Sequence, residues 1–453
     1  MNLKCTLYGE VYSFSSVKEV LAKANEPKSG DMLAGVAASS PRERMAAKLV
    51  LSQLTVRDIT ENPSVPYETD EVTRIILDDL DQSIYSSLAG LSIGGLREKI
   101  LSYEADEAAL LRMSRGLSSE TIAAVSKLMG NLDLIYAANK IHPTAHCNTT
   151  IGRKGIFSSR VQPNHPTDSV KGVTASLLEG LSYASGDAVL GLNPAIDTVE
   201  STTAILRLLN DVKERYSIPT QTCVLSHIST QIKAARSGAP MNLCFQSIAG
   251  SEKALNSFGT SAEMLAEGLA VMEEYSLAQG PDYMYFETGQ ASELSSGANF
   301  GTDQQTMESR CYGLARHYHP FLVNTVVGFM GPEYLYDGKQ IMRAALEDVF
   351  CGKMHGLPMG CDCCYTNHAQ ADQNDIDSLI TVIGAAGCCY VMGVPSADDV
   401  MLMYQSTGFH DIQAVREILG LRPIPEFEAW AEKLGILENG KLGRNAGDLT
   451  IFE

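Results

Sequence analysis

The sequence predicts a mixed α/β protein built on a (β/α)8 barrel. Eight short apolar runs between Ile156 and Pro395 each end in polar residues, and a stretch of helical character separates each run from the next. This spacing is typical of strand-plus-helix units. The expected strands are Gly155–Gln162, Ala188–Asn193, Thr220–Ser226, Asn242–Ser247, Asp282–Glu287, Pro320–Val327, Gly356–Cys361 and Cys388–Gly393.

Helical apolar spacing fills the intervals between these strands. The expected barrel helices are Thr167–Tyr183, Asp197–Tyr216, Ile228–Ser237, Ser251–Gln279, Thr302–His319, Leu335–Cys351, Ala371–Ala386 and Ser396–Gln405. The barrel is therefore assigned to residues 151–408, which is an ordinary size for this fold.

Residues 1–150 are expected to form a mainly helical cap or oligomerisation domain. Ser16 with Glu19, and Ser40 followed by Pro41 and Glu43, predict two helix starts. Further helical spacing runs over Asp70–Leu88 and Ser118–Lys140. Residues 409–453 are expected to be a short C-terminal extension of small helices and a loop at Asn439-Gly440.

Composition indicates a globular protein and argues against a nucleic-acid partner. The 453 residues are 45% hydrophobic and 20% charged, enough to bury a large core. The formal net charge of −19 repels phosphate backbones. It also suits a cationic substrate, although general solubility is the simpler explanation.

Nothing in the sequence predicts export or a membrane span. The first residues lack a basic segment followed by an apolar one, and the longest apolar stretch, Leu379–Pro395, is too short and contains glycines. Eleven cysteines, an odd number without an export signal, indicate reduced thiols in the cytoplasm.

Barrel enzymes place their chemistry at the carboxyl ends of the strands. The polar or large residues that close the runs are therefore the candidate site residues. They are Arg160, Gln162, Asn193, Gln246, Glu287, Phe329, Asp362 and Met392.

The first two strand ends offer a guanidinium and two amides. Arg160 and Gln162 are two residues apart, so both side chains are expected to point to the same side before Pro163 turns the chain. Asn193 closes the second strand before Pro194. The alternatives are an arginine paired with a neighbouring carboxylate and an asparagine that caps its own loop.

Two carboxylates close later strands. Glu287 ends an aromatic-rich strand, where a buried charge requires a nearby cation, and Asp362 follows the seventh strand. Three cysteines surround Asp362, but their spacing is poor for structural zinc or an iron–sulfur cluster. We expect no direct metal ligands; packing or a functional thiol are the alternatives for Cys361, Cys363 and Cys364.

Catalytic motifs of other classes are absent or incomplete. Gly435–Lys441 imitates a phosphate-binding loop but continues with Leu442 where a hydroxyl belongs. No nucleophile–base pair, zinc-protease motif or D-x-H-x-x-G segment for corrin ligation is present. The candidate residues are suited to holding a small cationic molecule by charge-assisted hydrogen bonds, while a cofactor supplies the difficult chemistry.

The sequence resembles the large, catalytic subunit of adenosylcobalamin-dependent ethanolamine ammonia-lyase over essentially its whole length. The segments that carry the resemblance are Phe157–Asn164, Leu190–Pro194, Tyr285–Gln290 and Met359–His368.

The resemblance implies roles for individual residues. Substrate contacts fall at Arg160, Gln162, Asn193, Glu287 and Asp362. Corrin contacts fall at Pro194, Gln246, Ser295 and Met401. Phe329, Met392 and Leu402 are expected to wall the radical pocket, with ordinary core packing as the alternative.

The resemblance also implies a mechanism. Ethanolamine binding would trigger cobalt–carbon homolysis in a corrin that keeps its own base on cobalt, and acetaldehyde and ammonia would leave. Glu287 and Asp362 would hold the ammonium with help from Asn193, while Arg160 and Gln162 would address the hydroxyl.

The partners implied are a smaller subunit of the same enzyme and further copies in a homodimer-based hetero-oligomer. The location implied is the cytoplasm, with a bacterial microcompartment as the narrower possibility. The rival functions are a cobalamin-dependent eliminase of diols or other amino alcohols, and a barrel-derived shell component that binds ethanolamine only as a ligand.

Overall fold

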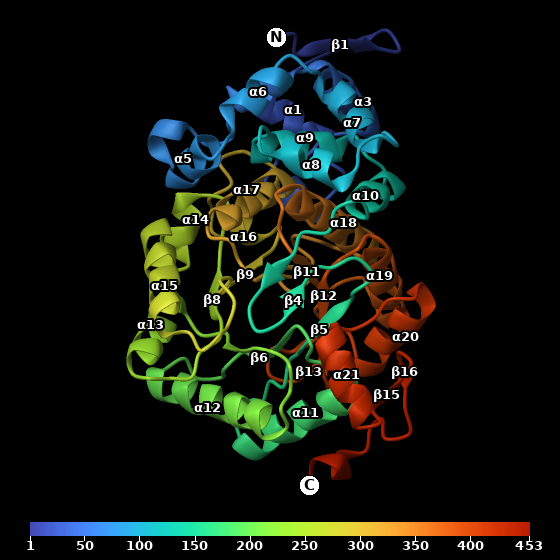
Figure 1. Cartoon of the computed structure of the whole chain (residues 1–453). Helices are drawn as coiled ribbons and strands as arrows, with labels where there is room; N and C mark the ends of the chain where they lie inside the picture. Colours follow the sequence, from blue (N-terminus) through green and yellow to red (C-terminus); the bar gives the residue numbers. More distant parts are fainter.

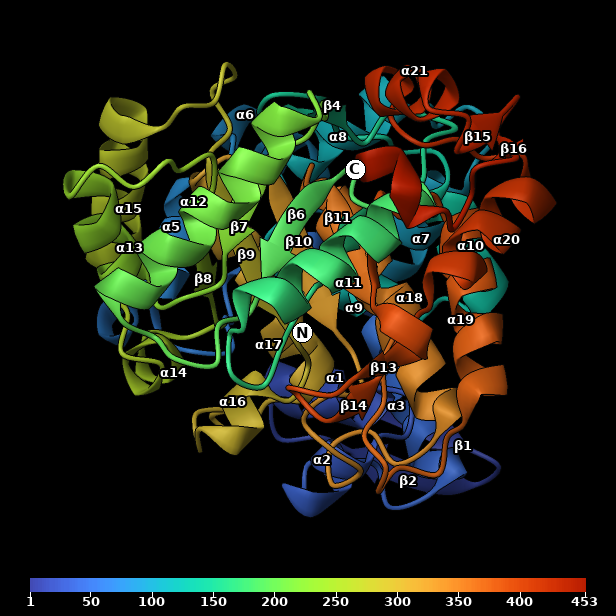
Figure 2. The same cartoon turned by 90° about the horizontal axis from the view of Figure 1, so that it is seen from below.

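An eight-stranded parallel barrel forms the centre of the protein, which confirms the predicted fold class. We describe it in a computed structural model of residues 1–453. The strands pair in the order β7-β6-β5-β12-β11-β10-β9-β8, and helices surround them (Figure 1 and Figure 2). They are β5 (Ser158–Val161), β6 (Val189–Leu192), β7 (Thr222–Val224), β8 (Cys244–Ser247), β9 (Met284–Thr288), β10 (Leu322–Val326), β11 (Met359–Asp362) and β12 (Tyr390–Gly393).

All eight strands overlap the predicted runs because parallel strands covered on both faces are apolar at most positions. Every residue of β5, β6, β11 and β12 is buried. Their carboxyl ends share one edge of the barrel, so the polar residues that close the runs are brought to one mouth.

Side-chain amides close the barrel between β7 and β8, which share no backbone ladder. Gln231 Nε2 donates to the carbonyls of Ser226 (2.6 Å) and Phe245 (2.7 Å), and its Oε1 accepts from the Phe245 N–H (3.0 Å). Asn242 Oδ1 accepts from the Thr222 N–H at 3.1 Å. These amides replace the missing ladder, so the barrel is continuous.

The surrounding helices follow the predicted alternation for most of the barrel. They are α11 (Val170–Ser182), α12 (Val199–Arg215), α13 (Ile228–Arg236), α14 (Glu252–Ser257), α15 (Ala262–Tyr275), the short α16 (Ser292–Ser295), α17 (Gln304–His317), α18 (Gly338–Met354), α19 (Gln373–Ala385) and α20 (Phe409–Leu419).

The single helix predicted over Ser251–Gln279 is instead a pair, α14 and α15. Gly259 adopts a left-handed backbone (φ +74°), which ends α14, and the Ser261 side chain then accepts from the Met264 N–H to begin α15. The prediction of one helix is therefore wrong at this glycine and serine.

The helix predicted over Ser396–Gln405 does not form. A 3-10 turn, η2 (Pro395–Ala397), leads into two short antiparallel strands, β13 (Asp398–Asp399) and β14 (Tyr404–Gln405). The Asp399 side chain accepts from two following backbone N–H groups, and such local bonds compete with helix formation. The helix that follows β12 is α20, which packs on α19.

Helices dominate residues 1–150, as predicted, after an unpredicted hairpin of β1 (Lys4–Leu7) and β2 (Glu10–Ser13). Ser16 and Ser40 cap helices as expected, although each paired glutamate bonds to the serine one position earlier. The helices are α1 (Val17–Ala24), α2 (Ser29–Leu33), α3 (Pro41–Gln53), α4 (Val56–Thr60), α5 (Glu71–Asp78), α6 (Gln82–Leu88), α7 (Ile93–Leu101), α8 (Glu107–Ser114), α9 (Ser119–Lys127) and α10 (Asn131–Ala138), with the 3-10 turn η1 (Tyr67–Thr69).

A hairpin of β3 (Ala145–His146) and β4 (Thr150–Ile151) leads into the barrel. The chain ends with α21 (Pro425–Lys433), a hairpin of β15 (Leu437–Glu438) and β16 (Lys441–Leu442), and the turn η3 (Leu449–Phe452). The division into domains at residues 150 and 408 stays a prediction. None of the helices combines the length and apolar character that crossing a membrane requires.

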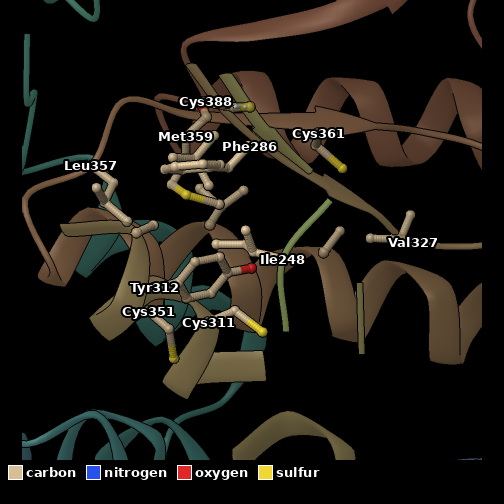
Figure 3. Close-up of a cluster of buried hydrophobic side chains, with 14 of the residues drawn as sticks. Ile248, Phe286, Cys311, Tyr312, Val327, Cys351, Leu357, Met359, Cys361 and Cys388 are labelled. Atoms are coloured by element: carbon tan, nitrogen blue, oxygen red, sulfur yellow. Dashed lines mark hydrogen bonds between the residues drawn. The ribbon is translucent and has the colours of Figure 1, made fainter. Parts of the chain in front are cut away.

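One continuous core of 97 buried residues extends from Phe14 to Phe452, and a second cluster of 15 fills the barrel interior. Figure 3 shows part of the larger core, in which cysteines pack among aliphatic and aromatic side chains. All eleven cysteines are unpaired and ten are buried. Most thiols therefore contribute to packing.

Buried ion pairs join the N-terminal helices to the barrel helices α17 and α18, against which they are stacked in Figure 1. Arg310 on α17 binds Glu120 (Nη1 to Oε1, 2.5 Å) and Asp70 (Nη2 to Oδ2, 2.9 Å), and its Nε donates to the Gly250 carbonyl at 2.7 Å. Because Arg310 satisfies two buried carboxylates, its loss leaves both of them without their cation.

We predict that Arg310→Gln lowers the free energy of unfolding by roughly 3–5 kcal/mol, because two buried carboxylates lose their partner. Chemical denaturation followed by circular dichroism measures this change. Arg57→Gln is the matched control, since Arg57 and Glu61 are both more than half exposed and such pairs contribute less than about 1 kcal/mol. Equal effects of the two substitutions would contradict the prediction.

Candidate active site

A cavity of about 490 Å³ opens at the carboxyl ends of the barrel strands. This is the place that the strand-end argument predicted. Nine predicted site residues line it: Arg160, Gln162, Asn193, Gln246, Glu287, Ser295, Phe329, Asp362 and Leu402.

Three predicted residues lie beside the cavity and do not line it. Met392 is fully buried in the barrel interior, where its Sδ lies 3.9 Å from Arg160 Nη1. Pro194 follows Asn193 in the loop after β6, and Met401 lies in the loop after β12 with its N–H bonded to Asp399 Oδ1 at 3.0 Å. Met392 therefore supports the Arg160 side chain from below.

The Arg160 guanidinium is buried, and each of its three nitrogens donates to a protein group. Nε donates to the Gly191 carbonyl at 3.1 Å, and Nη1 donates to Tyr285 Oη at 3.0 Å and Glu287 Oε1 at 3.1 Å. Nη2 donates to Asn193 Oδ1. A Cβ at Gly191 would lie 2.7 Å from Arg160 Nε, so glycine is required for this approach.

Neighbouring groups keep Arg160 charged. Burial alone lowers its pKa, but Tyr285 and Glu287 outweigh burial and raise the pKa above its ordinary value. Arg160 is therefore a fixed cation beneath the cavity.

The two carboxylate oxygens of Glu287 differ in their hydrogen-bond partners. Arg160, Tyr285 (3.0 Å) and Asn324 (3.4 Å) all donate to Oε1, whereas no protein group donates to Oε2. The side chain is 15% exposed and lines the cavity. Glu287 Oε2 is therefore the oxygen free to receive a ligand.

Asp362 is a buried carboxylate held by two hydroxyl groups. Tyr404 donates to Oδ2 and Ser406 to Oδ1, both at 2.7 Å. Burial raises the pKa of Asp362 to about 6, although these two hydrogen bonds oppose the rise. The charge of Asp362 is thus not matched by a cation of its own.

Fixed partners also determine the orientation of the two cavity amides. Gln162 Nε2 donates to Asp399 Oδ2 (2.6 Å) and Tyr404 Oη (2.9 Å), which uses both of its hydrogens. Gln162 Oε1 is left to accept from a ligand. Asn193 has the opposite arrangement, because its Oδ1 accepts from Arg160 and its Nδ2 has no protein acceptor.

The hydroxyl and carboxylate partners were not identified from the sequence. Tyr404, Ser406 and Asp399 lie between 42 and 242 residues from the cavity side chains they contact, so no local pattern connects them to these side chains. Tyr285 alone carried a local signal, because it is two residues before Glu287 and shares its side of β9.

The remaining cavity wall is mostly apolar, and its one histidine is fully engaged. His227 Nε2 donates to the Phe258 carbonyl at 3.2 Å, so Nδ1 accepts from the Ser229 N–H at 3.2 Å. Neither ring nitrogen is free to bind a metal. No group of three or more histidine, cysteine or carboxylate side chains is placed to hold a metal ion.

Exposed apolar side chains surround the cavity in the loops that follow the strands. Ile196 is 56% exposed, Met330 42% and Met403 74%. Gln246 and Ser295 add polar groups to the outer wall. These residues could hold a large, largely apolar cofactor over the cavity.

Comparison with known proteins identifies the family. A family model described as ethanolamine ammonia lyase large subunit matches residues 12–445. The chain is similar to the ethanolamine ammonia-lyase large subunits of Escherichia coli strain K12, Escherichia coli O157:H7 and Salmonella typhimurium strain LT2. It is 55% identical to each over 452 residues, which cover 100% of this chain and 100% of each relative.

This identity confirms the resemblance drawn from the four strand-end segments. Together with the match over nearly the full length, it shows that the chain belongs to the ethanolamine ammonia-lyase large-subunit family.

Proposed function

We propose that this chain is the catalytic subunit of an adenosylcobalamin-dependent ethanolamine ammonia-lyase, which converts ethanolamine to acetaldehyde and ammonia. The observation that carries the proposal is the convergence of three hydrogen-bond acceptors on one cavity. They are Glu287 Oε2, the Asp362 carboxylate and Gln162 Oε1. Three acceptors, two of them carboxylates, match the three N–H donors and the charge of a primary ammonium.

The hydroxyl of ethanolamine would lie on the opposite side, where donors are available. Asn193 Nδ2 has no protein acceptor, and Arg160 Nη2 lies beside it. This geometry favours Gln162 on the ammonium and Asn193 on the hydroxyl, the reverse of the roles that the resemblance implied. Glu287 lies between the two groups and would contact both.

The cavity surroundings are compatible with adenosylcobalamin. Gln246 and Ser295 lie in the outer wall, with Pro194 and Met401 in the loops beside it. When bound, the cofactor supplies the organic radical chemistry that removes hydrogen from the substrate carbon. Because both His227 nitrogens are engaged, the chain offers no free imidazole at the cavity, which supports binding of a corrin that keeps its own base.

The contribution of the chain would be positioning and exclusion of water. Arg160, Glu287 and Asp362 fix the substrate in one orientation, which replaces random encounter by a preformed geometry. Phe329 and Leu402 line the cavity with apolar surface and would limit access of water to a reactive intermediate.

A partner subunit and further copies of the chain complete the proposal. The relatives are named large subunits, which supports a smaller companion subunit here. The exposed apolar residues around the cavity offer a surface for it. A homodimer-based hetero-oligomer and a cytoplasmic location, free or within a bacterial microcompartment, stay predictions.

The rival functions fit the site less well. A diol eliminase needs no second carboxylate, yet Asp362 lies beside Glu287 without a cation of its own. A shell component that only binds ethanolamine would release neither acetaldehyde nor ammonia, so product release separates it from a lyase.

We predict that the complex with the small subunit and adenosylcobalamin releases acetaldehyde and ammonia from ethanolamine, and that Glu287→Gln abolishes this release. The amide of the glutamine has nearly the volume of the Glu287 side chain, but it lacks the negative charge that binds both Arg160 and the substrate ammonium. Coupled assays measure both products, and absorption spectra check that cobalamin still binds. Wild-type turnover in Glu287→Gln would refute the assigned role, and absence of turnover in the wild type would refute the function.

We also predict an acid limb in the dependence of kcat/KM on pH. The raised pKa of Asp362, about 6, means that the carboxylate is charged above this pH and becomes neutral as the pH falls through it, so ammonium binding weakens. Tyr404→Phe removes a hydrogen bond that lowers this pKa, so the limb should move to higher pH. Tyr136→Phe, on the distant helix α10, should leave it unchanged. A limb that stays in place in Tyr404→Phe would contradict the prediction.

A further inference from the structure

Asp399 is a buried carboxylate that lies behind the cavity without a cation. It is 3% exposed and belongs to β13, in the segment where the sequence predicted a helix. It does not line the cavity. Every one of its hydrogen bonds is received from an uncharged amide, so its charge is used to orient neutral groups.

The two oxygens of Asp399 have different partners. Oδ1 accepts from the backbone N–H groups of Met401 (3.0 Å) and Leu402 (2.7 Å), which folds the loop that brings Leu402 to the cavity. Oδ2 accepts from the side chains of Gln162 (2.6 Å) and Asn164 (2.7 Å) beyond β5. One residue therefore fixes both a cavity loop and a pair of amides.

Asp399 and Tyr404 together decide which atom Gln162 directs to the cavity, because Tyr404 donates its hydroxyl hydrogen to Asp362 and so only accepts from Gln162. An amide can rotate to exchange its oxygen and its NH2 group, but a carboxylate only accepts hydrogen bonds. Gln162 must therefore direct Nε2 to Asp399 and Oε1 to the cavity. The same reasoning fixes Asn164, whose Oδ1 accepts from the Asn193 backbone N–H at 2.8 Å.

We propose that Asp399 is a positioning residue that makes the cavity selective for an ammonium over a hydroxyl at the Gln162 position. The proposal rests on the proposed function, because it assigns the ammonium of the substrate to the acceptors Gln162, Glu287 and Asp362. Asp399 does not contact the substrate. It acts by holding Gln162 in the orientation in which this residue accepts a hydrogen bond.

Asp399→Asn removes this constraint while keeping nearly the same shape. The new amide satisfies the Met401 and Leu402 N–H groups with its oxygen and then directs NH2 at Gln162. Gln162 can meet this NH2 only by rotating its oxygen toward it, which gives up the hydrogen bond to Tyr404 Oη and turns the Gln162 NH2 toward the cavity. An N–H donor then faces the place where the ammonium binds, whereas a neutral hydroxyl can accept from it.

The test compares two ligands of nearly equal size, ethanolamine and 1,2-ethanediol. Calorimetry on the complex of both subunits, loaded with a cobalamin that lacks the adenosyl group, gives the two Kd values without turnover. The wild type should prefer the amine. The preference is the Kd for 1,2-ethanediol divided by the Kd for ethanolamine. In Asp399→Asn this ratio should fall by roughly tenfold or more, because a charge-assisted hydrogen bond to the ammonium is lost.

Three variants separate positioning from a general effect on stability. Asp398→Asn is the matched control, because Asp398 is the exposed neighbour on β13 and should leave the ratio unchanged. In a Gln162→Ala background, Asp399→Asn should no longer alter the ratio, since the group through which it acts is absent. Asp399→Ser keeps a short oxygen for the loop N–H groups but cannot reach Gln162, so it should lower the ratio even if Asp399→Asn does not fold.

The results that would overturn the role of Asp399 differ from those that would refute the proposed function. Equal losses of affinity for both ligands, or an unchanged effect in the Gln162→Ala background, would overturn the role of Asp399. A wild type that does not prefer the amine would also overturn it. A wild type that prefers the amine but releases no ammonia with adenosylcobalamin would refute the function and leave the positioning role standing.

Discussion

The architecture of the candidate active site depends on one buried guanidinium. Arg160 lies inside the barrel at 1% exposure, where a charge is costly unless all its donors are satisfied. Its partners come from three other strands or their ends: Gly191 and Asn193 with β6, Tyr285 and Glu287 on β9, and Met392 on β12. Satisfying this cation fixes the polar groups of the cavity relative to one another.

Arg160 does not neutralise all the carboxylates in and behind the cavity, so negative charge is in excess there. Arg160 pairs with Glu287, whereas Asp362 is held only by hydroxyls and Asp399 only by amides. One fixed cation thus faces three carboxylates. An ammonium bound as we propose would restore part of the balance, so the charge distribution favours a cationic ligand.

The fold and the residues at the strand ends could be predicted because their signals are local. Apolar runs buried on both faces define the eight strands, and the shared edge of a parallel barrel brings their ends together. Asp399, Tyr404 and Ser406 could not be found in this way. Their segment has helical apolar spacing, but the Asp399 carboxylate binds the local N–H groups and the remaining contacts are long-range.

The position of the substrate nitrogen tests the account most directly. A crystal structure of the two-subunit complex with ethanolamine, loaded with a cobalamin that lacks the adenosyl group, would reveal it. The account predicts the nitrogen within hydrogen-bonding distance of Glu287 Oε2, Asp362 and Gln162 Oε1, with the hydroxyl beside Asn193 and Arg160. A nitrogen beside Asn193, with the hydroxyl between Gln162 and Asp362, would contradict it.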